Sequence, residues 1–203
     1  MTKHKRKTSK LHSTVPNRVV LLVAVLGVGI IGSAYIIFSQ AAITAHYSGN
    51  AERDHLARVN TVRKNAGKRL VKHIDCLNNL AEKWSQNMAN QNKLYHNSNL
   101  AGSATNGWSM AHYCGGGRSS GYGETVAYAT GTDANASLSA FRSFMNSAPH
   151  KAIILDNKYN RVGIGIYVSS RGVMWVTHIY AACNSDCTAA KWSQAVTYPN
   201  SSW

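Results

Sequence analysis

The sequence predicts an α+β fold, preceded by one N-terminal transmembrane or signal helix. Apolar residues recur at steps of three and four over residues 52–91, which is the period of a helix that faces a core. Over residues 161–170 and 172–183 the period changes to two, which is the period of β-strands. Because helical and strand segments do not alternate regularly along the chain, α+β is favoured over a doubly wound parallel sheet.

The N-terminal helix is predicted from the uncharged apolar run of residues 19–38, VVLLVAVLGVGIIGSAYIIF. A helix of that length spans the roughly 30 Å hydrocarbon core of a bilayer, and the run lacks the polar face of a buried core helix. The basic residues of 1–18 are expected to stay in the cytoplasm, so the rest of the chain crosses the membrane. Small residues at Ser39 and Ala41 resemble a signal-peptidase site, so the segment 19–41 is either an uncleaved signal anchor or a signal peptide. Both alternatives place the remainder outside the cell, at the cell surface or secreted.

The exported part is predicted to contain a polar spacer at 42–51, one domain at 52–187 and a polar C-terminal tail at 188–203. The chain has 22 Lys and Arg against 8 Asp and Glu, and six of the basic residues lie within 1–18, which leaves sixteen against eight beyond it. This surplus suits anionic lipid head groups or an acidic cell-wall polymer, although a solvated basic surface is the simpler alternative. Because the domain is exported, nucleic acid is not expected as a partner.

The first half of the domain is predicted to be helical. Residues 52–91 are expected to form a helical region that is broken near Gly67. Residues 90–120 have loop composition, with one short helix or strand. The period-two segments 161–170 and 172–183 are expected to pair as an antiparallel hairpin.

Two further helices are predicted between these regions. One is expected to open near Glu124, and the other covers residues 132–148, with Thr132 or Asp133 as its N-cap. Pro149 is expected to end that helix.

All four cysteines lie in the exported part, where an oxidising compartment favours disulfides. Of the three possible pairings we expect Cys76–Cys114 and Cys183–Cys187. The second closes the short loop CNSDC, and the first joins a helix to a glycine-rich loop. A zinc site made of all four cysteines is the alternative, but the set lacks paired C-x-x-C spacing.

Three polar residues lie at the edges of predicted elements: His96, Glu124 and His150. Two imidazoles and a carboxylate can hold a zinc ion with an open position for water, or form a general base with an orienting acid. Their spacing matches no local metal motif, so surface or helix-capping roles remain the alternative on these residues alone.

The surrounding segments resemble the CAP superfamily (cysteine-rich secretory proteins, antigen 5 and pathogenesis-related proteins) in its bacterial SCP-like form. The resemblance covers roughly residues 56–182. Its motifs are VNTVRKNAG, LNNLAEKWSQNMA and LYH in the helical region, GETVA around the glutamate, FMNSAPHKAIILDNKYNRVGIGI and MWVTHIYA. Four such motifs in the same order are more specific than any one of them.

The resemblance implies a three-layer α-β-α sandwich with a small antiparallel sheet and a central cleft. His96, Glu124 and His150 would be three members of the family's tetrad of two histidines and two glutamates. The second glutamate is missing, with Ser147 or a neighbour in its place, and Ile153 replaces the asparagine that follows the second histidine. The three remaining residues therefore suit a metal site better than a catalytic acid–base pair.

The resemblance also implies a function in binding. We expect a secreted or membrane-tethered module whose cleft holds a divalent metal, zinc being the expected ion, or a lipid, sterol or cell-envelope ligand. A metal-dependent hydrolase that acts on peptide or cell-wall substrates with the same residues is the main alternative, and an adhesive surface protein with a vestigial cleft is the third. His178 stands where the family usually has glutamine, and we interpret it as a strand residue and not as a further cleft imidazole. The sequence does not predict the oligomeric state.

Overall fold

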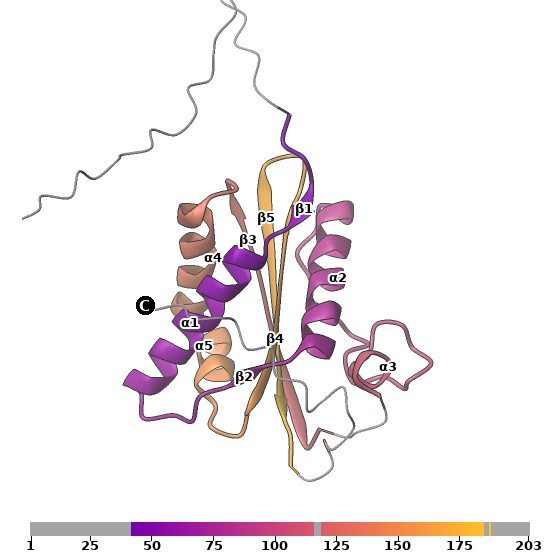
Figure 1. Ribbon diagram of the computed structural model, residues 1–203, viewed down its shortest axis with the longest axis vertical. Coiled ribbons are helices and arrows are strands. Elements are labelled where there is room, and N and C mark those ends of the chain that lie inside the picture. Colours follow the sequence, from indigo (N-terminus) through magenta and orange to yellow (C-terminus); the bar gives the residue numbers. More distant parts are fainter. Residues whose placement is uncertain (1–41, 116–118, 185–186, 188–203) are drawn as a thin grey trace, which may run out of the picture. The chain divides into compact units, whose positions relative to one another are not determined.

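A five-stranded sheet forms the centre of the domain in the computed structural model, which describes residues 42–115, 119–184 and 187 (Figure 1). The strands are β1 (His46–Tyr47), β2 (Lys72–His73), β3 (Gly121–Thr130), β4 (Arg161–Val168) and β5 (Val173–Ala182). The order is β1-β4-β5-β3 with antiparallel neighbours, and β2 pairs in parallel with the beginning of β4. The prediction of an α+β fold with a small, mainly antiparallel sheet is therefore confirmed.

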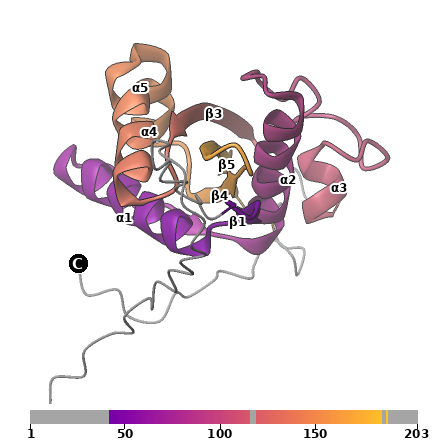
Figure 2. The same ribbon diagram turned by 90° about the horizontal axis from the view of Figure 1, so that it is seen from above.

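Helices cover both faces of this sheet (Figures 1 and 2). One face is covered by α1 (Gly49–Asn65), α4 (Ala134–Asn146) and α5 (Ala148–Leu155), and the other by α2 (Asp75–Gln91) together with the short α3 (Met110–Cys114). Within the described part of the chain no helix is both long and apolar enough to cross a membrane. The predicted segments 1–18, 19–41 and 188–203 lie outside the described residues.

Two glycines of β4 allow α2 to pack directly on the sheet. A Cβ atom on Gly163 would lie 2.1 Å from the carbonyl carbon of Leu77, and one on Gly165 would lie 1.9 Å from the backbone nitrogen of Glu82. No side chain fits at such distances, so the contact between helix and strand is made by backbone against backbone.

The fully buried Arg63 connects the end of α1 to the end of α5. Its guanidinium donates hydrogen bonds to the carbonyl oxygens of Ile154 at 2.6 Å, Asp156 at 3.1 Å and Tyr159 at 3.0 Å, and its Nε donates to that of Arg69 at 2.7 Å. Burial lowers the pKa of Arg63, and four backbone dipoles satisfy the side chain in place of a carboxylate. The residue thus fixes the helix that carries His150.

A chain of buried polar side chains crosses the core between α1, β5 and α4. His55 and His178 are both fully buried, and His55 Nδ1 lies 2.8 Å from His178 Nε2. His55 Nε2 lies 3.0 Å from the carbonyl oxygen of Ser137, and His178 Nδ1 lies 3.2 Å from the hydroxyl of Tyr180. One set of neutral tautomers satisfies every group: Tyr180 donates to His178, His178 donates to His55, and His55 donates to Ser137.

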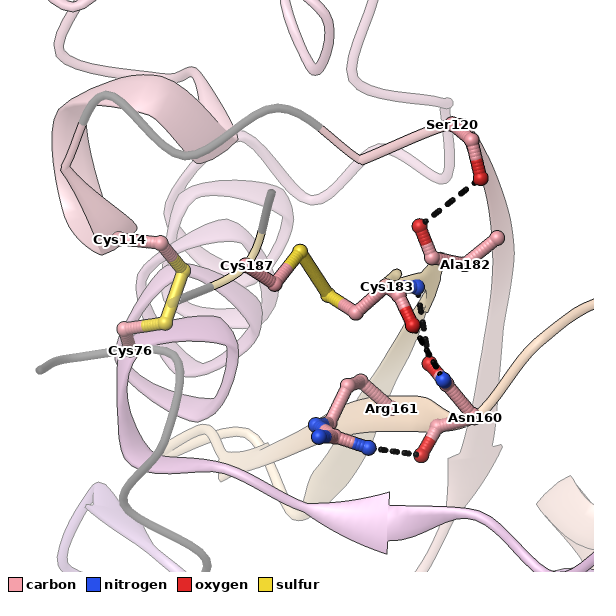
Figure 3. The surroundings of a disulfide bond; sticks show 8 residues. All are labelled: Cys76, Cys114, Ser120, Asn160, Arg161, Ala182, Cys183 and Cys187. Carbon is pink, nitrogen blue, oxygen red and sulfur yellow. Dashed lines mark hydrogen bonds between the residues drawn. A yellow bond between two sulfur atoms is a disulfide. The ribbon is translucent and has the colours of Figure 1, made fainter. Parts of the chain in front are cut away.

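The structure joins the cysteines in the two expected pairs, Cys76–Cys114 and Cys183–Cys187, and leaves none free (Figure 3). The first bond holds the beginning of α2 against the end of α3, with Cα atoms 5.0 Å apart. Near the second bond, the side chain of Asn160 accepts from the backbone nitrogen of Cys183 at 2.9 Å and donates to its carbonyl oxygen. A zinc site made of all four cysteines is therefore excluded.

Several elements agree with the sequence predictions. The helical region is interrupted after Asn65, and Gly67 has a positive φ of 65° that favours glycine. Asp133 is the N-cap of α4, where its carboxylate accepts from the backbone of Asn135 and Ala136. The strands β4 and β5 form the predicted antiparallel hairpin.

Three predictions about local structure are wrong. Residues near Glu124 form β3 and not a helix: both faces of this strand are largely buried, so the segment shows no regular alternation that would identify it as a strand. Pro149 does not end a helix but lies in the first turn of α5, where its missing N–H group has no intrahelical acceptor to lose. The predicted spacer at 42–51 contains β1 and the beginning of α1, because a two-residue strand is too short to show a period.

Candidate functional site

His96, Glu124 and His150 are brought together from three separate elements. Glu124 lies in β3, His150 in α5, and His96 in the loop that follows α2. His96 Nδ1 lies 2.7 Å from Glu124 Oε2, and the ring centroids of His96 and His150 are 5.9 Å apart. We call these three residues the His–Glu–His site.

The Glu124 carboxylate is the buried part of this site. Its side chain is only 6% exposed, and Oε2 accepts hydrogen bonds from His96 Nδ1 and, at 3.0 Å, from the backbone nitrogen of Asn97. Its other oxygen, Oε1, is buried and has no hydrogen-bond partner among the described residues. An unpaired buried acceptor costs about 1–3 kcal/mol, so a ligand group that reached Oε1 would remove this cost.

The loop that carries His96 is fixed by hydrogen bonds to its backbone. The indole nitrogen of Trp84 donates to the carbonyl oxygen of Tyr95 at 3.1 Å, and the side chain of Asn97 donates to the carbonyl oxygen of Trp108 at 2.8 Å. His96 itself is 58% exposed, so its ring faces solvent while its Nδ1 is held by the buried Glu124. The hydrogen bond to Glu124 raises the pKa of His96, because the carboxylate favours the protonated imidazole.

His150 is half-buried, on the side of the site formed by α5. Its ring meets Phe144 edge to face, with centroids 5.4 Å apart. Burial lowers the pKa of His150, and the neighbouring His96 lowers it further, while the charge on Glu124 opposes both effects. The two imidazoles of the site therefore have pKa values shifted in opposite directions.

The structure places His178 outside the His–Glu–His site. It is a fully buried residue of β5 opposite Thr125, and it contacts Phe144 with ring centroids 4.9 Å apart. The interpretation of His178 as a strand residue therefore agrees with its position. Its hydrogen bond to His55 had no signal in the sequence, since the two residues are 123 positions apart.

One residue that contributes to the site was missed. The backbone nitrogen of Asn97 donates to the same oxygen as His96, and its side chain holds the loop to Trp108. Its position directly after the predicted His96 was the only available signal.

The site offers donors that suit a metal, but they are not arranged as a closed metal centre. Imidazole nitrogens and a carboxylate oxygen are ligands that zinc accepts. In the described residues, however, no group of three or more His, Cys, Asp or Glu side chains is placed to hold a metal ion. As they stand, His96 and Glu124 form a hydrogen-bonded pair.

The fold is that of an α+β domain with helices on both faces of a small, mainly antiparallel sheet. The model of the cysteine-rich secretory protein family (CAP) matches residues 56–184, more than half of the chain, and the chain belongs to this family. No curated protein matches the sequence.

Solved structures show the same fold. An outer surface protein from Borrelia burgdorferi is 13% identical with a TM-score of 0.55, and the match covers 70% of this chain and 100% of that one. An extracellular protein with an SCP domain from Bacillus anthracis is 17% identical with a TM-score of 0.51, over 66% of this chain and 41% of that one. At these identities the likeness establishes the fold alone.

Proposed function

We propose that this chain is a CAP-domain binding protein of the cell surface, tethered by residues 19–41 or secreted after their cleavage. Its His–Glu–His site binds a divalent metal ion, for which zinc is the best candidate. The supporting relatives are named as surface and extracellular proteins. The apolar segment 19–38 and the two disulfides suit the same location.

The observation that carries this proposal is the unpartnered oxygen of Glu124. A cation or a hydrogen-bond donor that reaches Oε1 removes the cost of an orphaned buried acceptor. His96 contacts this carboxylate, the ring of His150 lies 5.9 Å from that of His96, and both would supply neutral nitrogen ligands. When bound, the metal would act as a fixed positive charge that attracts an anionic or carbonyl-bearing group of a ligand.

Binding is favoured over catalysis because the His–Glu–His site lacks a nucleophilic thiol and a second carboxylate. All four cysteines are in disulfides, so none can act as a nucleophile. Ser147 stands near the position where the related pattern has a second acid, so a two-carboxylate mechanism has no partner for Glu124 there.

Zinc titration of the full-length chain in neutral detergent at pH 7.5, followed by calorimetry, tests the metal site. We expect one site that is lost in His96→Ala and in His150→Ala. His112→Ala serves as the matched control, because His112 is an exposed histidine of α3. Absence of zinc binding, or equal binding in all variants, would refute the proposal.

A hydrolase remains the second candidate, because the two imidazoles have oppositely shifted pKa values. At a pH between the two pKa values such a pair provides one protonated and one neutral group, which general acid–base chemistry requires. A screen of peptides and muropeptides would show turnover that Glu124→Gln abolishes. Turnover that survives this change would place the chemistry elsewhere.

An apolar ligand has a separate place to bind. A cavity of about 320 Å³ is lined by residues of α1 and by Phe141 of α4, and its apolar walls include Ala57 and Val62. This volume lies at the lower end of the range of small-molecule sites, about 300–1,000 Å³. Binding of a fluorescent fatty acid or sterol should be lost in Ala57→Phe, which fills the cavity, and kept in His96→Ala; the reverse pattern would exclude this cavity as the lipid site.

A further inference from the structure

Basic side chains gather at the end of the domain that carries β2. We call this surface the basic end; it consists of Lys64, Lys68, Arg69, Lys72, Lys158 and Arg161. Asp75 and Asp156 are acidic residues that flank these segments, so with both counted the six basic residues outnumber the acidic ones by four. The basic end therefore holds much of the positive surplus of the exported part.

The two segments of the basic end are joined by backbone contacts. In the parallel pairing of β2 with β4, Lys72 is opposite Arg161, and the backbone nitrogen of Lys72 donates to the carbonyl oxygen of Asn160 at 3.0 Å. Arg69 donates through its guanidinium to the carbonyl oxygens of Asn157 and Lys158 at 2.9 and 3.1 Å. Residues 64–72 and 157–161 thus form one continuous surface.

The arginines and lysines of this surface differ in how far their charged groups are already bonded within the domain. Arg69 and Arg161 donate to backbone carbonyl oxygens, and Lys158 pairs with Asp156 at 2.9 Å. Lys64, Lys68 and Lys72 are exposed and form no ion pair with any of the described carboxylates.

The arrangement therefore presents three ammonium groups as point charges, each of which can pair with an anionic group without fixed geometry. Lysines at the end of a helix also offset its macrodipole, but that role is limited to the last turn and accounts for Lys64 alone.

The basic end and β1 lie at opposite ends of β4. The chain enters the domain through β1, which pairs with Tyr167 and Val168 at the far end of β4, whereas β2 pairs with Arg161 and Val162 at its beginning. In Figure 1, β1 lies at the top and β2 near the bottom. The seven residue steps of β4 from Arg161 to Val168, at about 3.3 Å each, separate these two ends by roughly 23 Å.

We propose that the basic end docks a linear, phosphate-bearing polymer of the cell envelope. Lysine point charges suit a flexible chain of repeated phosphates, each of which accepts from one ammonium group without fixed geometry. The inference rests on the proposed location at the cell surface. It does not rest on the His–Glu–His site, because the lysines and that site share no residue.

Binding of a synthetic poly(glycerol phosphate) to the full-length chain in neutral detergent tests this inference. The test variant is Lys64→Gln/Lys68→Gln/Lys72→Gln. The control variant, Lys83→Gln/Lys93→Gln/Arg142→Gln, removes the same charge from exposed residues elsewhere on the domain. Residues 1–18 are unchanged in both variants, so any difference between them reports on the exported domain.

We expect the test variant to bind at least about tenfold more weakly at low salt, because three of the positive charges that attract the anionic polymer are removed. For this variant, the slope of log Kd against log salt concentration should be smaller than that of the wild type by about two. The control variant should stay close to the wild type. Equal losses in both variants, or no binding by the wild type, would overturn the proposal.

Two further measurements separate this proposal from its alternatives. Mixed micelles that contain phosphatidylglycerol supply the same phosphate chemistry from a lipid. If the chain binds these micelles as well as it binds the polymer, with the same dependence on the three lysines, the partner is a lipid head group. The proposal would then be wrong. The variant His96→Ala should bind the polymer like the wild type. Loss of zinc binding and loss of polymer binding are therefore distinguishable failures.

Discussion

Replacing His55 and His178 together by glutamine should make the folded domain less sensitive to acid than the wild type. Burial lowers the pKa of His55 from 6.5 to about 4, and it also lowers the pKa of His178. Between pH 6.5 and 4 the unfolded chain therefore binds a proton at His55 that the folded chain does not. Stability from this residue is present above pH 6.5 and is lost as the pH falls towards 4.

The expected size follows from the same values. At about 1.4 kcal/mol for each unit of pKa difference, His55 lowers the free energy of unfolding by about 2 kcal/mol between pH 7.5 and 5. His178 acts in the same direction. Protonation would also break the hydrogen bond between the two rings, because both facing nitrogens would then carry a proton.

A buried carboxyl group changes the free energy of unfolding in the opposite direction as the pH falls. The test therefore compares the double variant with the wild type and not one protein at two pH values. Burial raises the pKa of Glu52 to about 8, and the adjacent Glu82 adds to this shift. Glu52 therefore stabilises the fold as the pH falls from about 8 towards 4.5 and masks part of the loss from His55 in the wild type. The difference in acid sensitivity between wild type and variant cancels this contribution, because Glu52 is unchanged in both.

Urea unfolding at pH 7.5 and pH 5, followed by tryptophan fluorescence, measures the effect. The double variant should lose at least about 2 kcal/mol less than the wild type over this range. His112→Gln, an exposed control, should behave like the wild type. If the double variant loses as much stability as the wild type, the buried neutral pair does not control acid sensitivity. Should the double variant fail to fold, the single variant His55→Gln removes the group whose pKa gives the expected effect and provides the comparison.

Three further substitutions test the packing of the core and the ionisation of the buried Glu52. Arg63→Met leaves the buried carbonyl oxygens of Ile154 and Tyr159 without a donor. Urea unfolding should show a free energy of unfolding lower by about 3 kcal/mol. A decrease of less than about 1 kcal/mol would contradict the role given to the guanidinium. Gly165→Ala places a Cβ 1.9 Å from a backbone nitrogen of α2 and should cost about 3 kcal/mol or more in thermal unfolding; a small effect would mean that α2 can move away. Glu52→Gln should remove a stability loss of about 3 kcal/mol that the wild type shows between pH 6 and 9, and an unchanged loss would show that Glu52 is not the group that ionises.

The sequence was sufficient to predict those elements whose signal is local. The hairpin of β4 and β5 has a clear alternation and a turn at Gly172, and Asp133 is a strong N-cap, so both predictions hold. The strand around Glu124 was predicted as a helix because its burial depends on elements packed on both faces. Such burial is a tertiary property that the residues of the strand do not encode alone.

The site shows the same division. The resemblance to the CAP superfamily singled out His96, Glu124 and His150, and the structure brings these three residues together. It could not reveal that the backbone of Asn97 shares the Glu124 oxygen, because a backbone contact leaves no mark in residue type. The partnership of His55 with His178 was equally invisible, since it joins α1 to β5 across the whole core.

Glu124 Oε2 accepts two hydrogen bonds from the loop that carries His96 and Asn97, so ligand binding at this carboxylate is coupled to the position of that loop. Both His96 and the backbone of Asn97 are attached to this one atom, so the carboxylate that would bind a ligand also anchors the segment that covers it. A ligand that reaches only Oε1 leaves the loop in place, whereas one that takes both oxygens must replace two hydrogen bonds and release the loop. Hydrogen exchange at the Asn97 amide would therefore distinguish the two modes of binding, because only the second mode exposes that amide to solvent.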